Sequence, residues 1–338
     1  MATHLGAKGY KVSIWVMETE VCSGINEKHE NSVFLPGIRL HDNVSATNKV
    51  TEAVEGSELI LLVIPTPFIG RWVAEHQTQL PTGVPLVCCS KGIEMDTLRT
   101  PFEILMDELP GKYHKWLCVI SGPSFAKEVA MGLPTNVTCA SDVPEVAAQV
   151  QDALSARHFR VYTGSDVIGA ELCGAIKNVL AIASGASDGL KFGANARAGL
   201  IARGLTEMAR LVVKKGGRAA TIMGLAGVGD LTLTCTGTLS RNYTVGRQLG
   251  EGKGMDTGAA VAEGVKTALA IHALAEKLRV DMPLCEAVYQ VIHKGVDIKV
   301  ALAGLQDRPL RSEEDDVFTA DFDAELHRAH KMPRKEAA

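Results

Sequence analysis

The order of strand-like and helix-like segments constrains this chain more than any other feature. Six segments rich in β-branched and other apolar residues occur before residue 165, and the β signal then stops. They span residues 11–17, 58–65, 85–90, 117–121, 135–140 and 159–163. Helical patterns, such as residues 18–30 and 144–155, lie between several of them. Strands that alternate with helices predict βαβ units and a mostly parallel sheet.

The rest of the chain has only helical periodicity. Apolar residues recur at helical spacing in segments 166–188, 195–215, 240–249, 264–278 and 283–294. A single core stops growing at about 250–300 residues, and this chain has 338. We therefore predict an α/β domain over residues 1–164 and an all-helical domain over residues 165–338. At the boundary, Ser165 or Asp166 can cap the incoming helix.

Composition excludes several functional classes. The net charge of −4 argues against a strong electrostatic footprint for nucleic acid. The longest clean apolar run, residues 59–64, is far shorter than the roughly 20 residues of a membrane span. Without an H-E-x-x-H motif or a Cys/His cluster, no metal is expected. The eight cysteines have no C-x-x-C spacing and are expected to be reduced. No secretory segment opens the chain, so we expect a cytoplasmic protein.

The start of the chain departs from the usual dinucleotide-binding pattern. That pattern begins with a strand and a G-x-G-x-x-G loop, whereas residues 2–8 read as the end of a helix with Gly9 near its C-cap. Residues 11–17 then correspond to the second strand. Because the first strand is central in the order 3-2-1-4-5-6, its loss splits the sheet and exposes two edges. We expect an N-terminally truncated sequence, with a genuine fold variant as the alternative. The glycine-rich residues 224–229 follow no strand and are interpreted as a helix–helix turn.

Two residues at the end of segment 11–17 bear on the cofactor. Met17 and Glu18 stand where a dinucleotide's ribose is usually bound. An acidic side chain there bonds a 2′-hydroxyl and repels a 2′-phosphate, which favours NAD over NADP. The alternative is that Glu18 only begins a helix, where the helix dipole favours a carboxylate.

Two polar segments directly follow strands, where ligands bind in parallel sheets. Lys91 comes after segment 85–90 and is placed for an anionic ligand, unless it is a solvated surface lysine. In the run Ser121-Gly122-Pro123-Ser124, glycine permits close backbone approach. Ser124 and nearby N–H groups can hold a phosphate. The alternative is a plain capped turn.

The helical half contributes a second set of candidates. Lys177 and Asn178 interrupt an apolar helix, and burial of a lysine is costly unless it is paired. Such a lysine can polarise a carbonyl and donate a proton, although a snorkelling lysine is the alternative. Asp230 is a candidate partner that would keep it charged. Arg241, at the start of a helix, offers a planar fork for phosphate.

Eight motifs occur together along nearly the whole chain. They are SKGI (90–93), SGPSFAKEVA (121–130), KNVLAI (177–182), NARAGLI (195–201), GLAGVGDL (224–231), SRNYTVG (240–246), VAEGVKT (261–267) and MPLCEAVY (282–289). In this combination and order the chain resembles the soluble NAD-dependent glycerol-3-phosphate dehydrogenases. The resemblance implies a Rossmann-like domain followed by a helical substrate and catalytic domain.

The resemblance also implies an activity and roles for residues. The activity is reversible reduction of dihydroxyacetone phosphate by NADH to sn-glycerol 3-phosphate, with Lys177 as proton donor or acceptor in a homodimer. The implied catalytic residues are Lys177, Lys91, Asp230 and Thr234. The implied substrate-binding residues are Lys91, Gly122, Ser124, Lys177, Asn178, Ser240, Arg241 and Asn242. The implied cofactor-binding residues are Met17, Lys91, Ala126, Arg241, Val261 and Glu263. Two alternatives stay open, a non-catalytic relative with impaired cofactor binding and a dehydrogenase of β-hydroxyacids.

Overall fold

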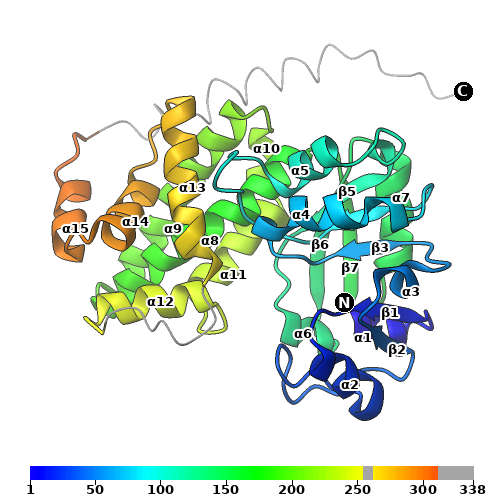
Figure 1. Ribbon diagram of the computed structural model, residues 1–338. Helices are drawn as coiled ribbons and strands as arrows, with labels where there is room; N and C mark the ends of the chain where they lie inside the picture. The colour runs from blue at the N-terminus through cyan, green and yellow to red at the C-terminus, as the bar shows by residue number, and fades with distance from the viewer. Residues whose placement is uncertain (254–261, 311–338) are drawn as a thin grey trace, which may run out of the picture. The chain divides into compact units, whose positions relative to one another are not determined.

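The first half of the chain contains two β-sheets (Figure 1). The computed structural model describes residues 1–253 and 262–310. A two-stranded parallel sheet pairs β1 (Val12–Trp15) with β2 (Val44–Thr47). The second sheet has the order β3 (Ile60–Leu62), β4 (Leu86–Cys88), β5 (Leu117–Ser121), β6 (Thr135–Ala140) and β7 (Phe159–Gly164). Its neighbouring strands are parallel except for β5 and β6. Both the mostly parallel topology and the division into two sheets are confirmed.

Helices cover both faces of the larger sheet. The helices of this half are α1 (Ala2–Ala7), α2 (Thr19–Lys28), α3 (Val50–Val54), α4 (Thr66–His76), α5 (Pro101–Glu108), α6 (Ala126–Ala130) and α7 (Pro144–Leu154), of which α2 and α3 contact the small sheet instead. Leu5 of α1 and Val150 of α7 share a buried core with Val137 of β6 and Val161 of β7. Helix α5 contacts β5, and α4 packs on α5.

The first helix is tied to the end of α7. The His4 ring nitrogen Nε2 lies 2.8 Å from the Leu154 carbonyl oxygen. Lys8 Nζ donates to the carbonyl oxygens of Ala153 and Ser155 at 2.7 and 2.6 Å. These side chains satisfy carbonyls that the helix end leaves without intrahelical partners, and a cation there complements the helix dipole. Burial lowers the pKa of His4, which favours a neutral ring.

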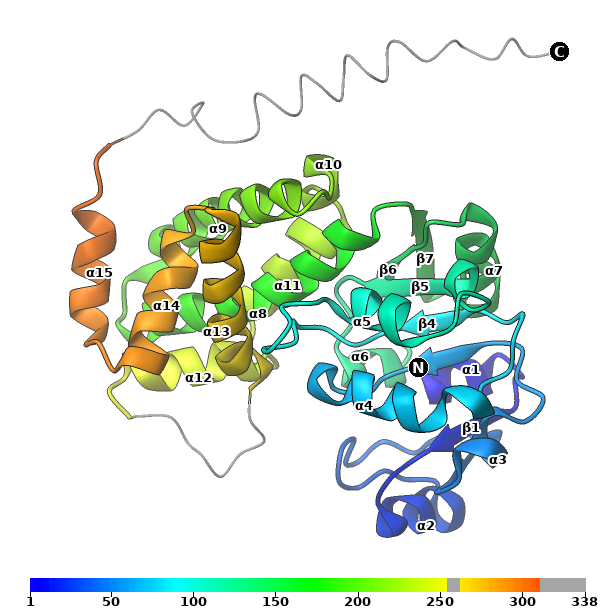
Figure 2. The same cartoon turned by 45° about the horizontal axis from the view of Figure 1, so that its top comes forward.

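The second half is helical throughout the residues described, as predicted (Figure 2). Its helices are α8 (Val167–Gly189), α9 (Gly193–Lys214), α10 (Ala219–Ile222), α11 (Asp230–Thr236), α12 (Arg241–Gly250), α13 (Glu263–Leu278), α14 (Pro283–Lys294) and α15 (Ile298–Gln306). Asp166 Oδ1 accepts a 2.9 Å hydrogen bond from the Gly169 amide and caps α8, one of the two predicted caps. The chain divides into two compact units, Met1–Glu171 and Leu172–Ala338, within α8.

Glycines let α12 lie directly on the backbone of α8. A Cβ atom added at Gly246 of α12 would stand 1.9 Å from the Ile182 carbonyl oxygen of α8. A Cβ atom at Gly185 of α8 would stand 2.0 Å from the Tyr243 carbonyl oxygen of α12. Glycine is needed where two backbones approach this closely. The first turn of α12 is therefore held at a fixed place on α8.

Two helical stretches are long and apolar enough, by composition alone, to cross a membrane. They are Val167–Gly189 and Ala219–Thr236. In the first, 89% of the most apolar window is buried inside the protein, as expected of a core helix. The eight cysteines all lie in the described ranges as free thiols, six of them buried.

Candidate active site

In the first unit, two predicted site residues follow the ends of neighbouring parallel strands at matching positions in the sheet. Cys88 of β4 pairs with Val119 of β5, and Lys91 and Gly122 each follow their strand's paired residue by three positions. Lys91 is half-buried, and its carbonyl oxygen accepts a 2.9 Å hydrogen bond from the Thr66 hydroxyl at the start of α4. The carboxyl edge of the sheet therefore carries both residues, where α/β proteins bind ligands.

The loop after β5 has the features of a ligand cradle. Gly122 has φ of +132°, and a Cβ atom there would lie 3.1 Å from Val137 Cα, so both conformation and space require glycine. Ser124 Oγ donates to the Gly122 carbonyl oxygen at 3.0 Å. Ser121 is buried, and its hydroxyl oxygen has no hydrogen-bond partner among the residues described. A buried hydroxyl without a partner is costly, and a bound polar ligand would satisfy it. Ala126 is exposed at the first position of α6.

Met17 and Glu18 lie exposed at the end of β1. Met17 is 80% exposed, and Glu18 is the N-cap residue of α2. The Glu18 side chain makes no capping hydrogen bond, and its carboxylate lies at the N-terminal end of α2, where the helix dipole favours negative charge. Groups at the carboxyl end of a parallel strand are placed where α/β proteins bind ligands, so Met17 and Glu18 are candidates for contact with a dinucleotide.

In the second unit, Lys177 and Asp230 form a buried ion pair. Lys177 Nζ of α8 donates to Asp230 Oδ1 of α11 at 2.5 Å, and the residues are 6% and 0% exposed. Asp230 follows a π-helical turn, Leu225–Gly229, which confirms a helix–helix connection between α10 and α11. Thr234 lies one turn beyond Asp230 and donates to its carbonyl oxygen at 2.6 Å. The predicted lysine–aspartate partnership is confirmed, and the snorkelling alternative is wrong because the ammonium is inside the protein.

The N-terminus of α12 is joined to α8 and α13 by two asparagines. Asn242 Nδ2 donates to Asn178 Oδ1 at 2.9 Å, and Asn242 Oδ1 accepts from the Gly264 amide at 2.9 Å. Both side chains are buried. Ser240 Oγ caps the helix by accepting from the Tyr243 amide at 3.2 Å. The asparagine amides thus hold three helix segments together beside Lys177, a function that local sequence did not predict.

The remaining candidates lie at helix starts. Arg241 is exposed at the first position of α12, and Glu263 is exposed at the first position of α13. Val261 lies outside the described residues. Sequence reasoning gave Ser121 no role of its own, although it ends the apolar strand β5, which is the signal that identified Gly122.

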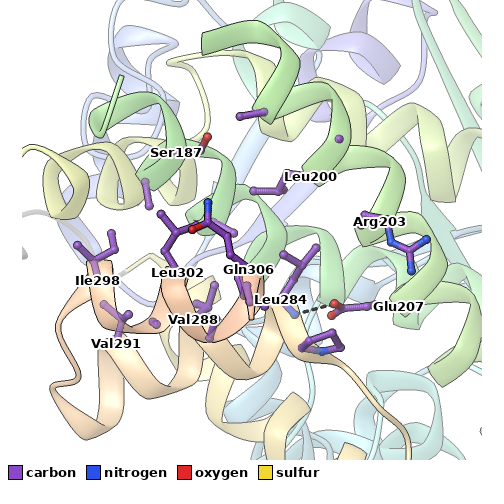
Figure 3. A pocket seen from close by; sticks show the side chains of 18 of the residues that line it. Ser187, Leu200, Arg203, Glu207, Leu284, Val288, Val291, Ile298, Leu302 and Gln306 are labelled. Atoms are coloured by element: carbon purple, nitrogen blue, oxygen red, sulfur yellow. Dashed lines mark hydrogen bonds between the residues drawn. The ribbon is translucent and has the colours of Figure 1, made fainter. Parts of the chain in front are cut away.

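A cavity of about 530 Å³ lies elsewhere in the second unit. Apolar side chains of α8, α9, α14 and α15 line it, including Leu200, Val288 and Leu302 (Figure 3). At one side, Glu207 accepts a hydrogen bond of 2.6 Å from the Leu284 amide. None of the predicted site residues lines this cavity. We therefore assign the candidate active site by its charged groups rather than by cavity size.

Comparison with known proteins identifies the family of the chain. The family described as "NAD-dependent glycerol-3-phosphate dehydrogenase N-terminus" matches residues 1–147, and the corresponding C-terminus family matches residues 166–303. A glycerol-3-phosphate dehydrogenase [NAD(P)+] of Anaeromyxobacter sp. (strain K) is 47% identical over 317 residues, covering 93% of this chain and 96% of the relative. The enzyme of the same name from Geobacter sp. (strain M21) is 46% identical, with coverage of 93% and 95%.

A solved structure is also similar. Glycerol-3-phosphate dehydrogenase from Coxiella burnetii matches with a TM-score of 0.84 and 37% identity, covering 91% of this chain and 94% of that chain. Sequence and fold agree, and the chain belongs to the NAD-dependent glycerol-3-phosphate dehydrogenase family.

Proposed function

We propose that the protein reversibly reduces dihydroxyacetone phosphate with NADH to sn-glycerol 3-phosphate. The buried pair of Lys177 and Asp230 carries the proposal, because a lysine is costly to bury without a chemical or structural partner. Lys177 lies on α8, and α8 also holds the first turn of α12 through Asn178. A reacting group and a helix N-terminus that can bind an anion therefore belong to the same unit.

Lys177 is the proposed acid in the reduction. When bound, NADH supplies the hydride that adds to the ketone carbon. Negative charge then develops on the ketone oxygen, and a preorganised ammonium beside it stabilises that charge. Lys177 Nζ gives its proton to this oxygen, and in the reverse direction takes it from the hydroxyl. Asp230 Oδ1, 2.5 Å from Nζ, fixes the ammonium and favours its charged form.

The start of α12 is the proposed phosphate site. The first N–H groups of a helix have no intrahelical acceptor and attract anions. Ser240 Oγ caps the Tyr243 amide, and the exposed guanidinium of Arg241 supplies a bidentate partner for phosphate oxygens. Binding at this remote group holds the carbonyl in position for reaction.

The first unit is the proposed cofactor-binding part. Glu18 would accept from the ribose hydroxyls of NAD and repel a 2′-phosphate. Met17, Lys91, Ala126 and the Ser121–Ser124 loop are the other proposed contacts in this unit. In the second unit, Arg241, Val261 and Glu263 complete the set.

We also propose a homodimer. Family membership supports it, and so does α15, on which none of the described residues is buried and Val300 is 62% exposed. Sedimentation of the full chain measures the assembly state.

Replacement of Lys177 tests the proposed chemistry. We expect Lys177→Met to lower kcat for dihydroxyacetone phosphate by about 100-fold or more, the usual contribution of a general acid. Loss of the lysine leaves Asp230 buried without its cation, which is strongly destabilising. The double variant Lys177→Met/Asp230→Asn removes both charges and keeps the test independent of folding.

Lys214→Ala, an exposed lysine at the end of α9, is the matched control and should retain wild-type activity. Nicotinamide absorbance follows turnover. Activity of the folded double variant within about tenfold of wild type would show that Lys177 is not the acid. A wild-type chain that folds and binds substrate but never turns over would indicate the non-catalytic alternative.

A further inference from the structure

Tyr243 of α12 directly follows the proposed phosphate site and forms a polar cluster with Asp188 and Arg197. Its ring is buried, with the residue 7% exposed, and its hydroxyl donates to Asp188 Oδ2 at 2.5 Å. The same oxygen accepts from Arg197 Nη1 at 2.5 Å. Asp188 lies near the end of α8, and Arg197 lies near the start of α9. The cluster therefore joins α8, α9 and α12.

The neighbouring residue of α12 is held at a different point of the same helix. Asn242 bonds Asn178, ten positions before Asp188 on α8. Ten residues of α-helix span about 15 Å. The first turn of α12 is thus hydrogen-bonded to α8 at two separate points, and the close glycine contacts between the two helices lie between these points. Two points of attachment fix both the position of the turn and its rotation about the helix axis.

The hydrogen-bond donors of the cluster are well defined. Burial and the bond to Asp188 raise the pKa of Tyr243, so its hydroxyl remains a donor. Asp188 in turn raises the pKa of Arg197, whose charge balances the carboxylate. A hydrogen bond to a charged group is stronger than one between neutral groups. The fastening at Asp188 is consequently the stronger of the two.

We propose that Tyr243, acting through Asp188 and Arg197, is a positioning residue that sets the orientation of the phosphate-binding turn Ser240–Asn242. The inference rests on the proposed function, since it concerns how that site binds the substrate phosphate. Tyr243 does not itself contact substrate in this assignment. Its backbone amide is bonded to Ser240 Oγ, so a rotation of Tyr243 also displaces the helix cap.

Tyr243→Phe in the full chain removes the hydroxyl and keeps the ring. We expect KM for dihydroxyacetone phosphate to rise about tenfold or more while kcat changes by less than about threefold. The reason is that the phosphate-binding turn is no longer held in the orientation that binds the substrate. Turnover of dihydroxyacetone, which lacks the phosphate, should not change. Asp188→Asn should have a similar effect, and the double variant should be no worse than the more affected single variant.

Tyr289→Phe is the matched control, since Tyr289 is a buried tyrosine of α14 outside the proposed site. It should leave KM unchanged. An unchanged KM in a folded Tyr243→Phe protein overturns the inference while the proposed function stands. Equal losses with dihydroxyacetone and its phosphate also overturn it, because they indicate general structural damage. A wild-type chain inactive on both substrates refutes the proposed function instead.

Discussion

Replacement of Gly246 by alanine tests the close packing of α12 on α8. The new Cβ atom would lie 1.9 Å from the Ile182 carbonyl oxygen and 2.7 Å from its carbonyl carbon. Ordinary contact begins near 3.4 Å, so the helices must separate by more than an ångström. Because both contacting groups are backbone, no side chain can rotate to relieve the overlap. The 2.9 Å bond between Asn242 and Asn178 lies beside this contact and would be stretched.

The expected cost follows from these two effects. Overpacking costs roughly 1–3 kcal/mol, and a buried polar group left without its partner costs about 1–3 kcal/mol more. We therefore expect Gly246→Ala to lower the free energy of unfolding by about 2–6 kcal/mol. In the protein that remains folded, KM for dihydroxyacetone phosphate should rise because the phosphate-binding turn is displaced. Urea unfolding and steady-state kinetics measure the two effects.

Gly199→Ala on α9 is the matched control, since no atom lies within 4 Å of an added Cβ there. Alanine is favoured over glycine in a helix by about 1 kcal/mol, so this variant should be as stable as wild type or more stable. If Gly246→Ala loses less than about 1 kcal/mol and keeps its KM, the reasoning from backbone contact is wrong.

Two further outcomes are expected. Met17→Arg should raise kcat/KM for NADPH relative to NADH by about tenfold, because arginine accommodates a 2′-phosphate; an unchanged ratio would argue against cofactor binding at the end of β1. Burial raises the pKa of Glu207 to about 7, so the folded state holds its proton more tightly than the unfolded state. That contribution to stability is complete below the unfolded pKa and is lost as pH rises through about 7. Glu207→Gln should flatten this fall between about pH 4.5 and about pH 7 in urea unfolding, and an equally steep fall in both proteins would refute it.

Continuous apolar runs made most of the fold predictable. Strands β5 and β6 have the limits predicted, as does α14, because their patterns are unbroken and their flanking residues distinct. Strand β2, Val44–Thr47, was missed because it has only four residues and two of them are polar. Helices α3, α6 and α10 have only four or five residues, too few for helical periodicity to show.

The site was predictable where one residue type was chemically out of place. Lys177 in an apolar helix required a partner, and Asp230 was found bonded to it. The pairing of Asn178 with Asn242 was not predicted, because the two residues are 64 positions apart and the apolar setting of Asn178 does not indicate which residue is its partner. Tyr243 escaped notice for the same reason. Pairings of this kind arise from helix packing, which single-sequence patterns do not encode.

The bond between His4 and Leu154 also has a consequence for folding. It closes a loop of 150 positions within the first unit. Contacts between residues this far apart form slowly, because loop entropy must be lost before they contribute stability. During synthesis, α1 leaves the ribosome long before its partner helix α7 exists. Although β1 and β2, which also contact α1, emerge earlier, the side of α1 that meets the end of α7 stays uncovered until residues near 160 emerge. In that interval this side of the nascent chain is open to self-association.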